Sequence, residues 1–114
     1  MQSKILSYIY RIIGHERYDN SINYAELLEM KKNNKNIILL DVRSKQEFQE
    51  EHLSGAINIP NFEIDAKIEN ILKDKKSIII LYCKTGGRSS KALKKLQKLG
   101  YENVYNLKNG LDNI

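Results

Sequence analysis

The chain has one cysteine among its 114 residues, and this scarcity excludes two classes of small protein. A single thiol cannot close an internal disulfide, so the chain is not a disulfide-stapled secreted scaffold. It cannot supply a cysteine-rich zinc site either, and the two histidines, His15 and His52, add little ligand capacity. We therefore expect no metal and no cofactor. The lone Cys83 is either a small core residue or a reactive thiol.

Long apolar runs are also missing. None approaches the roughly 20 residues needed to span a bilayer, so we expect no transmembrane segment. Near the N-terminus a short apolar stretch is interrupted by Arg11, and no small-residue cleavage site follows it, which argues against a signal peptide. We therefore predict a cytoplasmic protein whose thiol is reduced.

Arginine is scarce, with 4 residues against 15 lysines. The net charge of +5 is concentrated in residues 67–114, which hold 11 basic and 4 acidic side chains. A positive half could attract a nucleic acid, a membrane surface or a small anion. Because no arginine cluster with interleaved aromatic rings offers phosphate forks or base stacking, we predict no nucleic-acid partner. Most of the excess charge is typical of a solvated, lysine-rich face.

What the chain does contain is enough Ile, Leu, Val and Phe for the core of one domain. Residues 1–14 carry an apolar stripe at helical spacing: Ile5, Leu6, Ile9, Ile12 and Ile13. We predict an amphipathic N-terminal helix and connector over residues 1–20, ahead of a single domain over residues 21–114. The helix could dock on the domain, pair with another copy or contact a membrane surface peripherally. Docking is the default prediction.

Strands are predicted at four places along the rest of the chain. The apolar runs at 37–42 and 78–82 are too short for typical helices, and their continuity indicates strands buried on both faces. Shorter strands are predicted at 56–59 and 104–107. Two strands buried on both faces indicate a parallel sheet that is covered on both sides.

Helices are predicted between these strands. The spacing of a capping box occurs twice, and each pair opens a helix: Asn23 with Glu26, and Ser44 with Glu47. Apolar spacing predicts two further helices, over residues 62–73 and 89–99. Strands that alternate with helices indicate an α/β fold with three layers, in which helices flank a central, mainly parallel sheet.

Cys83 directly follows the second buried strand, at the carboxyl edge of the predicted sheet, where open α/β sheets bind their ligands. Gly86 and Gly87 let the backbone curl before the next helix begins. Such a loop points several N–H groups at one spot, and Arg88 and Lys84 add positive charge. This cradle would stabilise a thiolate, so we predict a lowered pKa for Cys83.

A lone activated thiolate has two chemistries open to it. It could attack phosphorus, as in cysteine-dependent phosphatases, or it could attack sulfane sulfur and carry it as a persulfide. Those phosphatases resemble one another in the motif C-x5-R, whereas Cys83 and Arg88 are spaced as C-x4-R. A loop that is one residue shorter should form a smaller cradle, which suits a terminal sulfur better than a phosphoryl group.

Two longer motifs carry a resemblance to a known family. The loop from Cys83 to Ser89 reads C-K-T-G-G-R-S and matches the pattern C-x-x-G-x-R-S. Upstream, D-V-R stands at 41–43, E-F at 47–48 and H-L-S-G-A-I-N-I-P at 52–60. The chain therefore resembles a single-domain rhodanese over about residues 21–114. The resemblance implies the rhodanese-like fold and sulfurtransferase activity.

The same resemblance implies a role for each matched position. Cys83 would be the catalytic nucleophile, taking sulfane sulfur from thiosulfate or a persulfide and passing it to a thiol, a protein or cyanide. The loop would bind the small anionic donor and hold the transferred sulfur, through Lys84, Thr85, Gly86, Gly87, Arg88 and Ser89. Asp41 and Arg43 are interpreted as a supporting ion pair, and His52 as a structural residue before Gly55.

The sequence departs from the family pattern near its C-terminus. The family usually closes with G-G-[IL]-x-x-W, whereas Asn109 stands here for the first glycine and Ile114 for the tryptophan. Ser89 could donate a hydrogen bond or cap the following helix. A rhodanese-like domain can also be a non-catalytic binding module, although such modules usually lack the cysteine. A cysteine-dependent phosphatase is the least favoured alternative.

Overall fold

The computed structural model describes residues 20–34 and 36–114. The predicted N-terminal helix and nearly all of its connector fall on residues 1–19, outside the described residues, so they stay predictions. Within the described part of the chain, no helix is long and apolar enough to cross a membrane.

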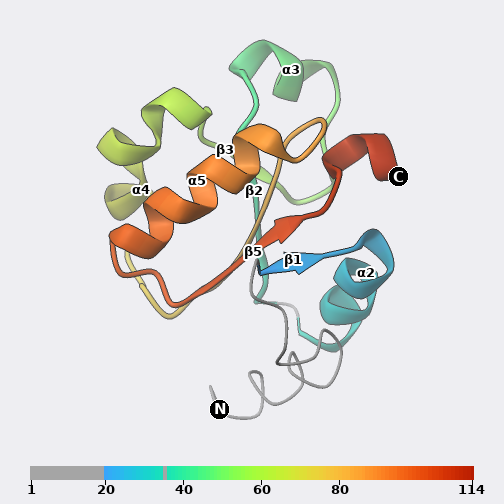
Figure 1. Cartoon of the computed structure of the whole chain (residues 1–114), viewed down its shortest axis with the longest axis horizontal. Helices are drawn as coiled ribbons and strands as arrows, with labels where there is room; N and C mark the ends of the chain where they lie inside the picture. The colour runs from blue at the N-terminus through green and yellow to red at the C-terminus, as the bar shows by residue number, and fades with distance from the viewer. Residues whose placement is uncertain (1–19, 35) are drawn as a thin grey trace.

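Five parallel strands form one sheet in the order β1-β5-β4-β2-β3 (Figure 1). The strands are β1 (Ser21–Ile22), β2 (Ile38–Asp41), β3 (Ile57–Asn58), β4 (Ile78–Tyr82) and β5 (Asn103–Leu107). In β4, which lies at the centre, Leu81 stands opposite Leu40 of β2 and Asn106 of β5. Because the strands are parallel, their carboxyl ends meet at one edge of the sheet.

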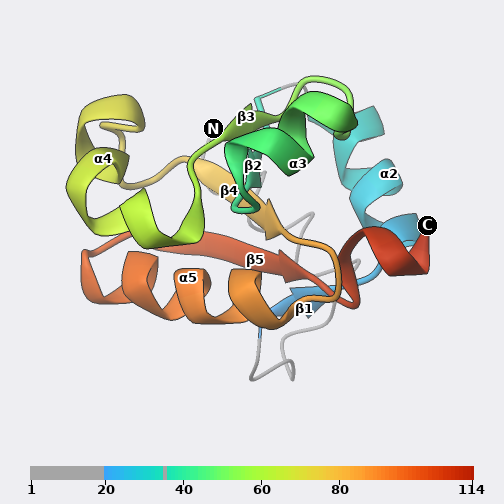
Figure 2. The same cartoon turned by 90° about the horizontal axis from the view of Figure 1, so that it is seen from above.

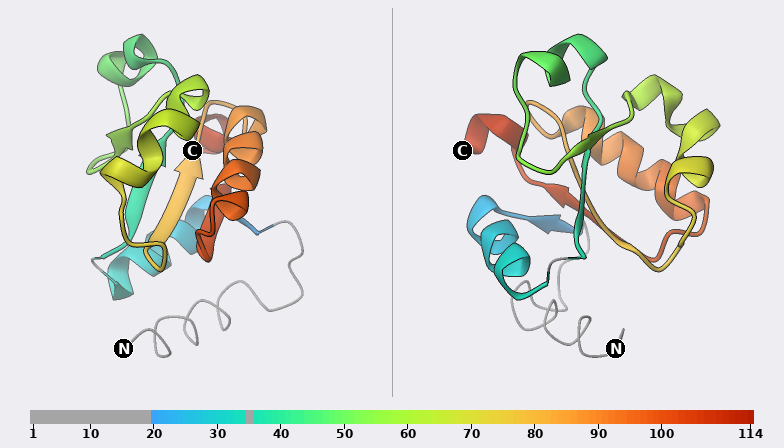
Figure 3. Two further views of the ribbon diagram at one scale, coloured as in Figure 1. Left: turned by 90° about the vertical axis from the view of Figure 1, so that its left-hand side faces the viewer. Right: turned by 180° about the vertical axis from the view of Figure 1, so that it is seen from behind.

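The helices cover both faces of this sheet. They are α2 (Tyr24–Asn33), α3 (Lys45–Glu50), α4 (Ile64–Ile71) and α5 (Gly87–Lys98), with 3-10 turns η1 (Asn61–Glu63) and η2 (Gly110–Asn113). Residues of α4 and α5 form one apolar core with the sheet, and residues of α2 form the other (Figure 2). The short α3 lies at the carboxyl edge, at the top of Figure 1 and of both views in Figure 3.

The alternation of side chains along β4 explains these two cores. Ile79 and Leu81 pack with α4 and α5, whereas Ile78, Ile80 and Tyr82 pack with α2. Every residue of the strand is buried, as expected when side chains of a parallel strand leave both faces into apolar layers. The three-layer α/β fold that the sequence predicts is therefore confirmed.

Both predicted capping boxes are present. The Glu26 N–H donates to Asn23 Oδ1 at 2.8 Å while the Asn23 N–H donates to Glu26 Oε1 at 2.9 Å. In α3 the corresponding distances between Ser44 and Glu47 are 3.2 and 3.1 Å. Each pair satisfies two backbone donors that the first turn of a helix leaves without partners.

Several elements differ from the prediction, and the turn η2 was not predicted. Strand β1 was not predicted, because two residues are too few to show alternation. The helix predicted over 62–73 is divided into η1 and α4, and the apolar Phe62 is 81% exposed. Helix α5 begins at Gly87, two residues before the predicted start. This earlier start places Ser89 inside the first turn of the helix.

Candidate active site

The loop that joins β4 to α5 lies at the carboxyl edge of the sheet (Figure 1). Cys83 is the first residue of this loop. Cys83 is 1% exposed, so its thiol is almost enclosed by the surrounding residues. Strand β4 is fixed by pairing on both sides, with β2 and β5. Cys83 therefore directly follows a strand that is held on both sides, as the sequence predicts.

Backbone N–H groups converge on this sulfur. The Gly86 N–H donates to Sγ at 3.1 Å and the Ser89 N–H at 3.4 Å, while Ser89 Oγ lies 3.4 Å away. Gly86 caps α5 with φ at 101°, a left-handed conformation that glycine adopts without a steric penalty. The turn of the backbone at this glycine aims its own N–H and the N–H of Ser89, in the first turn of the helix, at the sulfur.

Two opposing effects act on the thiol. Burial alone would raise the pKa of Cys83, whereas the hydrogen bonds from the Ser89 hydroxyl and from the N–H groups of Ser89, Gly86 and Thr85 lower it. The hydrogen bonds outweigh burial, and the pKa lies below its ordinary value. This agrees with the pKa that the loop sequence predicts. A lowered pKa raises the fraction of nucleophilic thiolate at neutral pH.

Ser89 bonds to a residue that sequence reasoning missed. The N-cap of α5 is Gly86, so Ser89 does not cap the helix, and its hydroxyl instead donates within the site. Ser89 Oγ lies 3.2 Å from the Gly86 carbonyl oxygen and 2.5 Å from Asn106 Oδ1. Asn106 belongs to β5, and its residue is 8% exposed. The available signal was a polar residue at a core-facing position of a predicted strand.

Arg88 is paired with a carboxylate. Its guanidinium donates to both carboxylate oxygens of Glu47, at 2.8 and 3.1 Å. The hydrogen bond from Arg88 is the main reason that the pKa of Glu47 falls to about 2, against a smaller opposing effect of burial. Glu47 therefore joins α3 to the first turn of α5. Sequence reasoning treated it as a helix cap and missed this second role.

We expect Glu47→Gln to lower the free energy of unfolding by about 1 kcal/mol at neutral pH. The substitution keeps the cap, since glutamine serves in a capping box, and removes the ionic pair. The side chains of Arg88 and Glu47 are 42% and 32% exposed, so solvent screens the pair and limits the loss. Denaturant unfolding of both proteins measures the difference.

The difference in unfolding free energy between wild type and Glu47→Gln should shrink at acid pH. The pKa of Glu47 drops from 4.5 to about 2 on folding, so its contribution is present above pH 4.5 and is lost as pH falls toward 2. The gap between wild type and Glu47→Gln should close over that window. A matched control is Glu63→Gln, which breaks the exposed pair with Lys67 on α4. A gap that stays constant down to pH 2 would contradict the assignment.

The C-terminal turn holds the loop from the other side. The Leu111 N–H donates to the Cys83 carbonyl oxygen and the Asp112 N–H to that of Lys84, both at 3.0 Å. A Cβ added at Gly110 would lie 2.2 Å from the Cys83 carbonyl oxygen, so only glycine fits there. Asn109 has φ at 62°, a left-handed conformation in which asparagine is tolerated better than most residues.

A family model now adds to this geometry. The model of the rhodanese-like domain matches residues 23–114. The chain belongs to the rhodanese-like domain family. The resemblance carried by the two sequence motifs is therefore confirmed.

Individual relatives support the assignment. Thiosulfate sulfurtransferase PspE of Escherichia coli is 39% identical over 67 residues, which are 59% of this chain and 64% of that protein. Adenylyltransferase and sulfurtransferase UBA4 of Candida albicans is 41% identical over 71% of this chain and 20% of its own length. The chain spans less than two thirds of these curated relatives. A solved structure, a rhodanese-related protein from Thermoplasma volcanium, is 33% identical with a TM-score of 0.71, covering 82% of this chain and 87% of that one.

In this rhodanese-like domain the D-V-R motif forms a buried ion pair beside the loop. Arg43 Nη2 lies 2.8 Å from Asp41 Oδ2, with side chains 6% and 0% exposed. Arg43 also donates to the Glu51 carbonyl oxygen at 2.6 Å, and Asn58 Nδ2 donates to the carbonyl oxygens of Asp41 and Arg43, both at 2.9 Å. The pair and these hydrogen bonds tie the end of β2 to β3 and to the residue that ends α3. That Asp41 and Arg43 support the active loop stays a prediction.

His52 lies next to α3. Its ring stacks on Phe48 with 3.7 Å between centroids, and its Nδ1 lies 2.7 Å from the Phe48 carbonyl oxygen. The next residue, Leu53, donates its N–H to the buried Tyr82 hydroxyl at 3.0 Å. These contacts hold the turn after α3 against the end of β4, and they agree with a structural role for His52.

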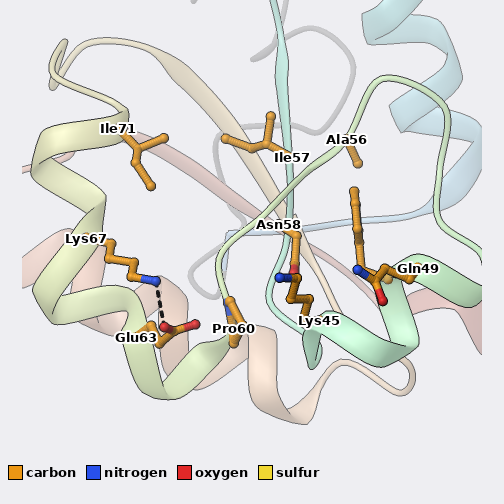
Figure 4. A pocket seen from close by; sticks show the side chains of 10 residues that line it. Lys45, Gln49, Ala56, Ile57, Asn58, Pro60, Glu63, Lys67 and Ile71 are labelled. Carbon is orange, nitrogen blue, oxygen red and sulfur yellow. Dashed lines mark hydrogen bonds and ion pairs between the residues drawn. The ribbon is translucent and has the colours of Figure 1, made fainter.

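Two surface pockets differ in their relation to the sulfur. One of about 370 Å³ adjoins the loop, and Lys84 lines it together with Arg43, Glu47, Glu50 and Asp112. Another of about 560 Å³ lies between α3, β3 and α4 (Figure 4), where Lys67 pairs with Glu63. Among the described residues, none from the loop between Cys83 and Ser89 lines that second pocket.

Proposed function

We propose that this chain is a rhodanese-type sulfurtransferase that carries sulfane sulfur on Cys83. The observation that carries the proposal is the convergence of N–H groups on a nearly enclosed sulfur whose pKa is lowered. Relatives named thiosulfate sulfurtransferase and sulfurtransferase support the same activity class. Cys83 is the proposed catalytic nucleophile.

The proposed cycle needs no external oxidant. The Cys83 thiolate attacks the outer sulfur of thiosulfate, a new S–S bond forms, and the old S–S bond breaks with its electron pair leaving on sulfite. A persulfide donor would release a thiolate instead. An acceptor thiol or cyanide then attacks the outer sulfur, and the Cys83 thiolate is restored. One thiol is sufficient for this cycle, and the chain has one.

The loop residues have separate proposed tasks. Gly86 and Ser89 supply the observed donors to the sulfur, and Gly87 and Thr85 complete the turn that aims them. Lys84 is exposed at the rim of the adjoining pocket, where it would meet an anionic donor. Arg88, which is 42% exposed, would orient that donor while retaining its contact with Glu47.

The two alternative functions make different demands on the site. A binding module needs no activated thiol, whereas the hydrogen bonds here lower the pKa of Cys83. A phosphatase needs N–H groups arranged around a phosphoryl group beyond the sulfur. In this loop the spacing from Cys83 to Arg88 is C-x4-R, which leaves one residue fewer than the C-x5-R loop of those enzymes to surround such a group. Both observations favour sulfur transfer.

The test is the intact mass of the reduced protein after incubation with thiosulfate, mercaptopyruvate or glutathione persulfide. We expect a mass gain of one sulfur atom, located on Cys83 by peptide mapping and removed by cyanide. The donor that loads fastest identifies the preferred substrate class. No adduct with any donor, or turnover of an aryl phosphate, would overturn the proposal. The cytoplasmic location and the domain boundary at residue 21 stay predictions.

A further inference from the structure

The hydroxyl of Ser89 has one proton and three neighbouring atoms that could accept it. Ser89 Oγ lies 2.5 Å from Asn106 Oδ1, 3.2 Å from the Gly86 carbonyl oxygen and 3.4 Å from Cys83 Sγ. A hydroxyl donates one hydrogen bond at a time. The amide of Asn106 therefore competes directly with the sulfur for this proton, from the shorter distance.

The placement of Asn106 has no packing explanation. Along β5, Val104 packs into the core beneath α4 and α5, and Asn106 follows two residues later on the same face of the strand. Tyr105 and Leu107 face the other core. A buried amide in an apolar layer is unfavourable unless it is hydrogen-bonded, and the oxygen of this amide accepts a hydrogen bond from Ser89.

The charge on the sulfur changes during the proposed cycle. As a thiolate, Cys83 Sγ carries the negative charge and gains from every donor around it. Once the outer sulfur is attached, Sγ is neutral and has single bonds to Cβ and to the outer sulfur. The negative charge then lies on the outer sulfur. The Ser89 proton is then needed less by Sγ, and Asn106 Oδ1 is the nearest acceptor for it.

We propose that Asn106 is a positioning residue of the sulfur-transfer site, which draws the Ser89 proton away from Cys83 and so favours the sulfur-loaded state over the free thiolate. The statement about the loaded state rests on the proposed function. The competition for the proton does not rest on the proposed function, because it takes place in the unloaded protein. Removing the amide should leave the Ser89 hydroxyl to divide its proton between the sulfur and the Gly86 carbonyl oxygen, so the sulfur receives this hydrogen bond more often.

Other charged groups near the loop bear on the same sulfur. They are Lys84 in the loop, Arg88 on α5, its partner Glu47 on α3, Asp41 and Arg43 after β2, and Asp112 in η2. None of these charged residues is substituted in the variants that test the proposal. A change in the titration of Cys83 can therefore be attributed to the substitution of Ser89 or Asn106.

The test is the pH dependence of Cys83 alkylation by iodoacetamide, measured without any sulfur donor. Because Cys83 is the chain's one thiol, the rate reports that site alone. We expect Asn106→Ala to lower the midpoint by about half a pH unit and Ser89→Ala to raise it by a similar amount, the size expected for one redistributed hydrogen bond. The double variant should match Ser89→Ala, because the amide acts through the hydroxyl.

The two variants should shift the midpoint in opposite directions. Simple loosening of the site would instead raise the midpoint in both variants. Asn103→Ala is the matched control, since Asn103 is another buried amide of β5 and donates to the Lys76 carbonyl oxygen at 2.8 Å. It should leave the midpoint unmoved. If Asn106→Ala does not fold, Asn106→Val removes the same acceptor with a side chain that suits a strand.

Two results would overturn the proposal: a midpoint that rises or stays unchanged without the amide, or one that falls equally when Ser89 is already alanine. A wild-type protein that takes up no sulfur would instead contradict the proposed function. When sulfur is taken up, Asn106→Ala should hold about threefold less persulfide at equilibrium with a thiol–persulfide pair, in line with the shift in midpoint.

Discussion

Gly110→Ala should lower the free energy of unfolding by about 3 kcal/mol or more and reduce sulfur transfer about a hundredfold. The new Cβ would lie 2.2 Å from the Cys83 carbonyl oxygen and 2.7 Å from that of Lys84. Both neighbours are backbone atoms, so relief requires the loop itself to move. The left-handed φ of 54° at Gly110 adds strain for any L side chain. The nucleophile is on the displaced segment, which is why activity falls with stability.

Gly55→Ala is the matched control for this variant. Gly55 also has a left-handed φ, 82°, but a Cβ there would meet nothing within 4 Å. We expect a loss of about 1 kcal/mol from backbone strain alone, with full transfer activity. Denaturant unfolding and steady-state turnover measure both variants. Equal losses in the two proteins would show that the close approach to Cys83 is unimportant.

Cys83→Ser should abolish sulfur transfer, with a fall in turnover of at least about a thousandfold. A serine hydroxyl stays protonated at neutral pH and forms no persulfide, although it can accept the same hydrogen bonds from the Gly86 and Ser89 N–H groups. The fold should therefore persist, with a change in unfolding free energy within about 1 kcal/mol. Turnover with thiosulfate and cyanide measures the first effect, and denaturant unfolding the second.

The stability measurement is the control for this loss. Turnover that disappears while the variant remains folded locates the chemistry at the sulfur. A variant that retains more than a small part of wild-type turnover would show that another group accepts the sulfur. A variant that loses turnover by unfolding would leave Cys83 as a structural residue, and this outcome would contradict its assignment as nucleophile.

The sequence was sufficient for features decided within a few residues. An unbroken apolar run indicated that β4 is buried on both faces, and a cysteine, two glycines and an arginine after it indicated a loop that turns into a helix. Both capping boxes were readable, because a cap and its partner are three residues apart. The start of α5 was misplaced because Gly86 caps it with backbone conformation alone, and no side chain at the cap marks the position.

Contacts between distant segments could not be read in the same way. Glu47 and Arg88 are separated by 41 positions and meet because α3 lies over the loop at the carboxyl edge. Ser89 and Asn106 are separated by 17 and meet because β5 pairs beside β4 with Asn106 opposite Leu81. Neither residue spacing predicts a contact, since the separation in space depends on strand order and register.

By itself, the sequence determined the parallel α/β class, the position of Cys83 at the end of a buried strand, the glycine turn behind it and the family that these motifs indicate. Periodicity, capping and left-handed turns are local properties, set by backbone sterics and nearest neighbours. The tertiary structure alone decided which carboxylate holds Arg88, which amide competes for the Ser89 proton and why Gly110 has no room for a side chain. Each of these depends on a distance of a few ångströms between segments that meet only when the sheet is complete.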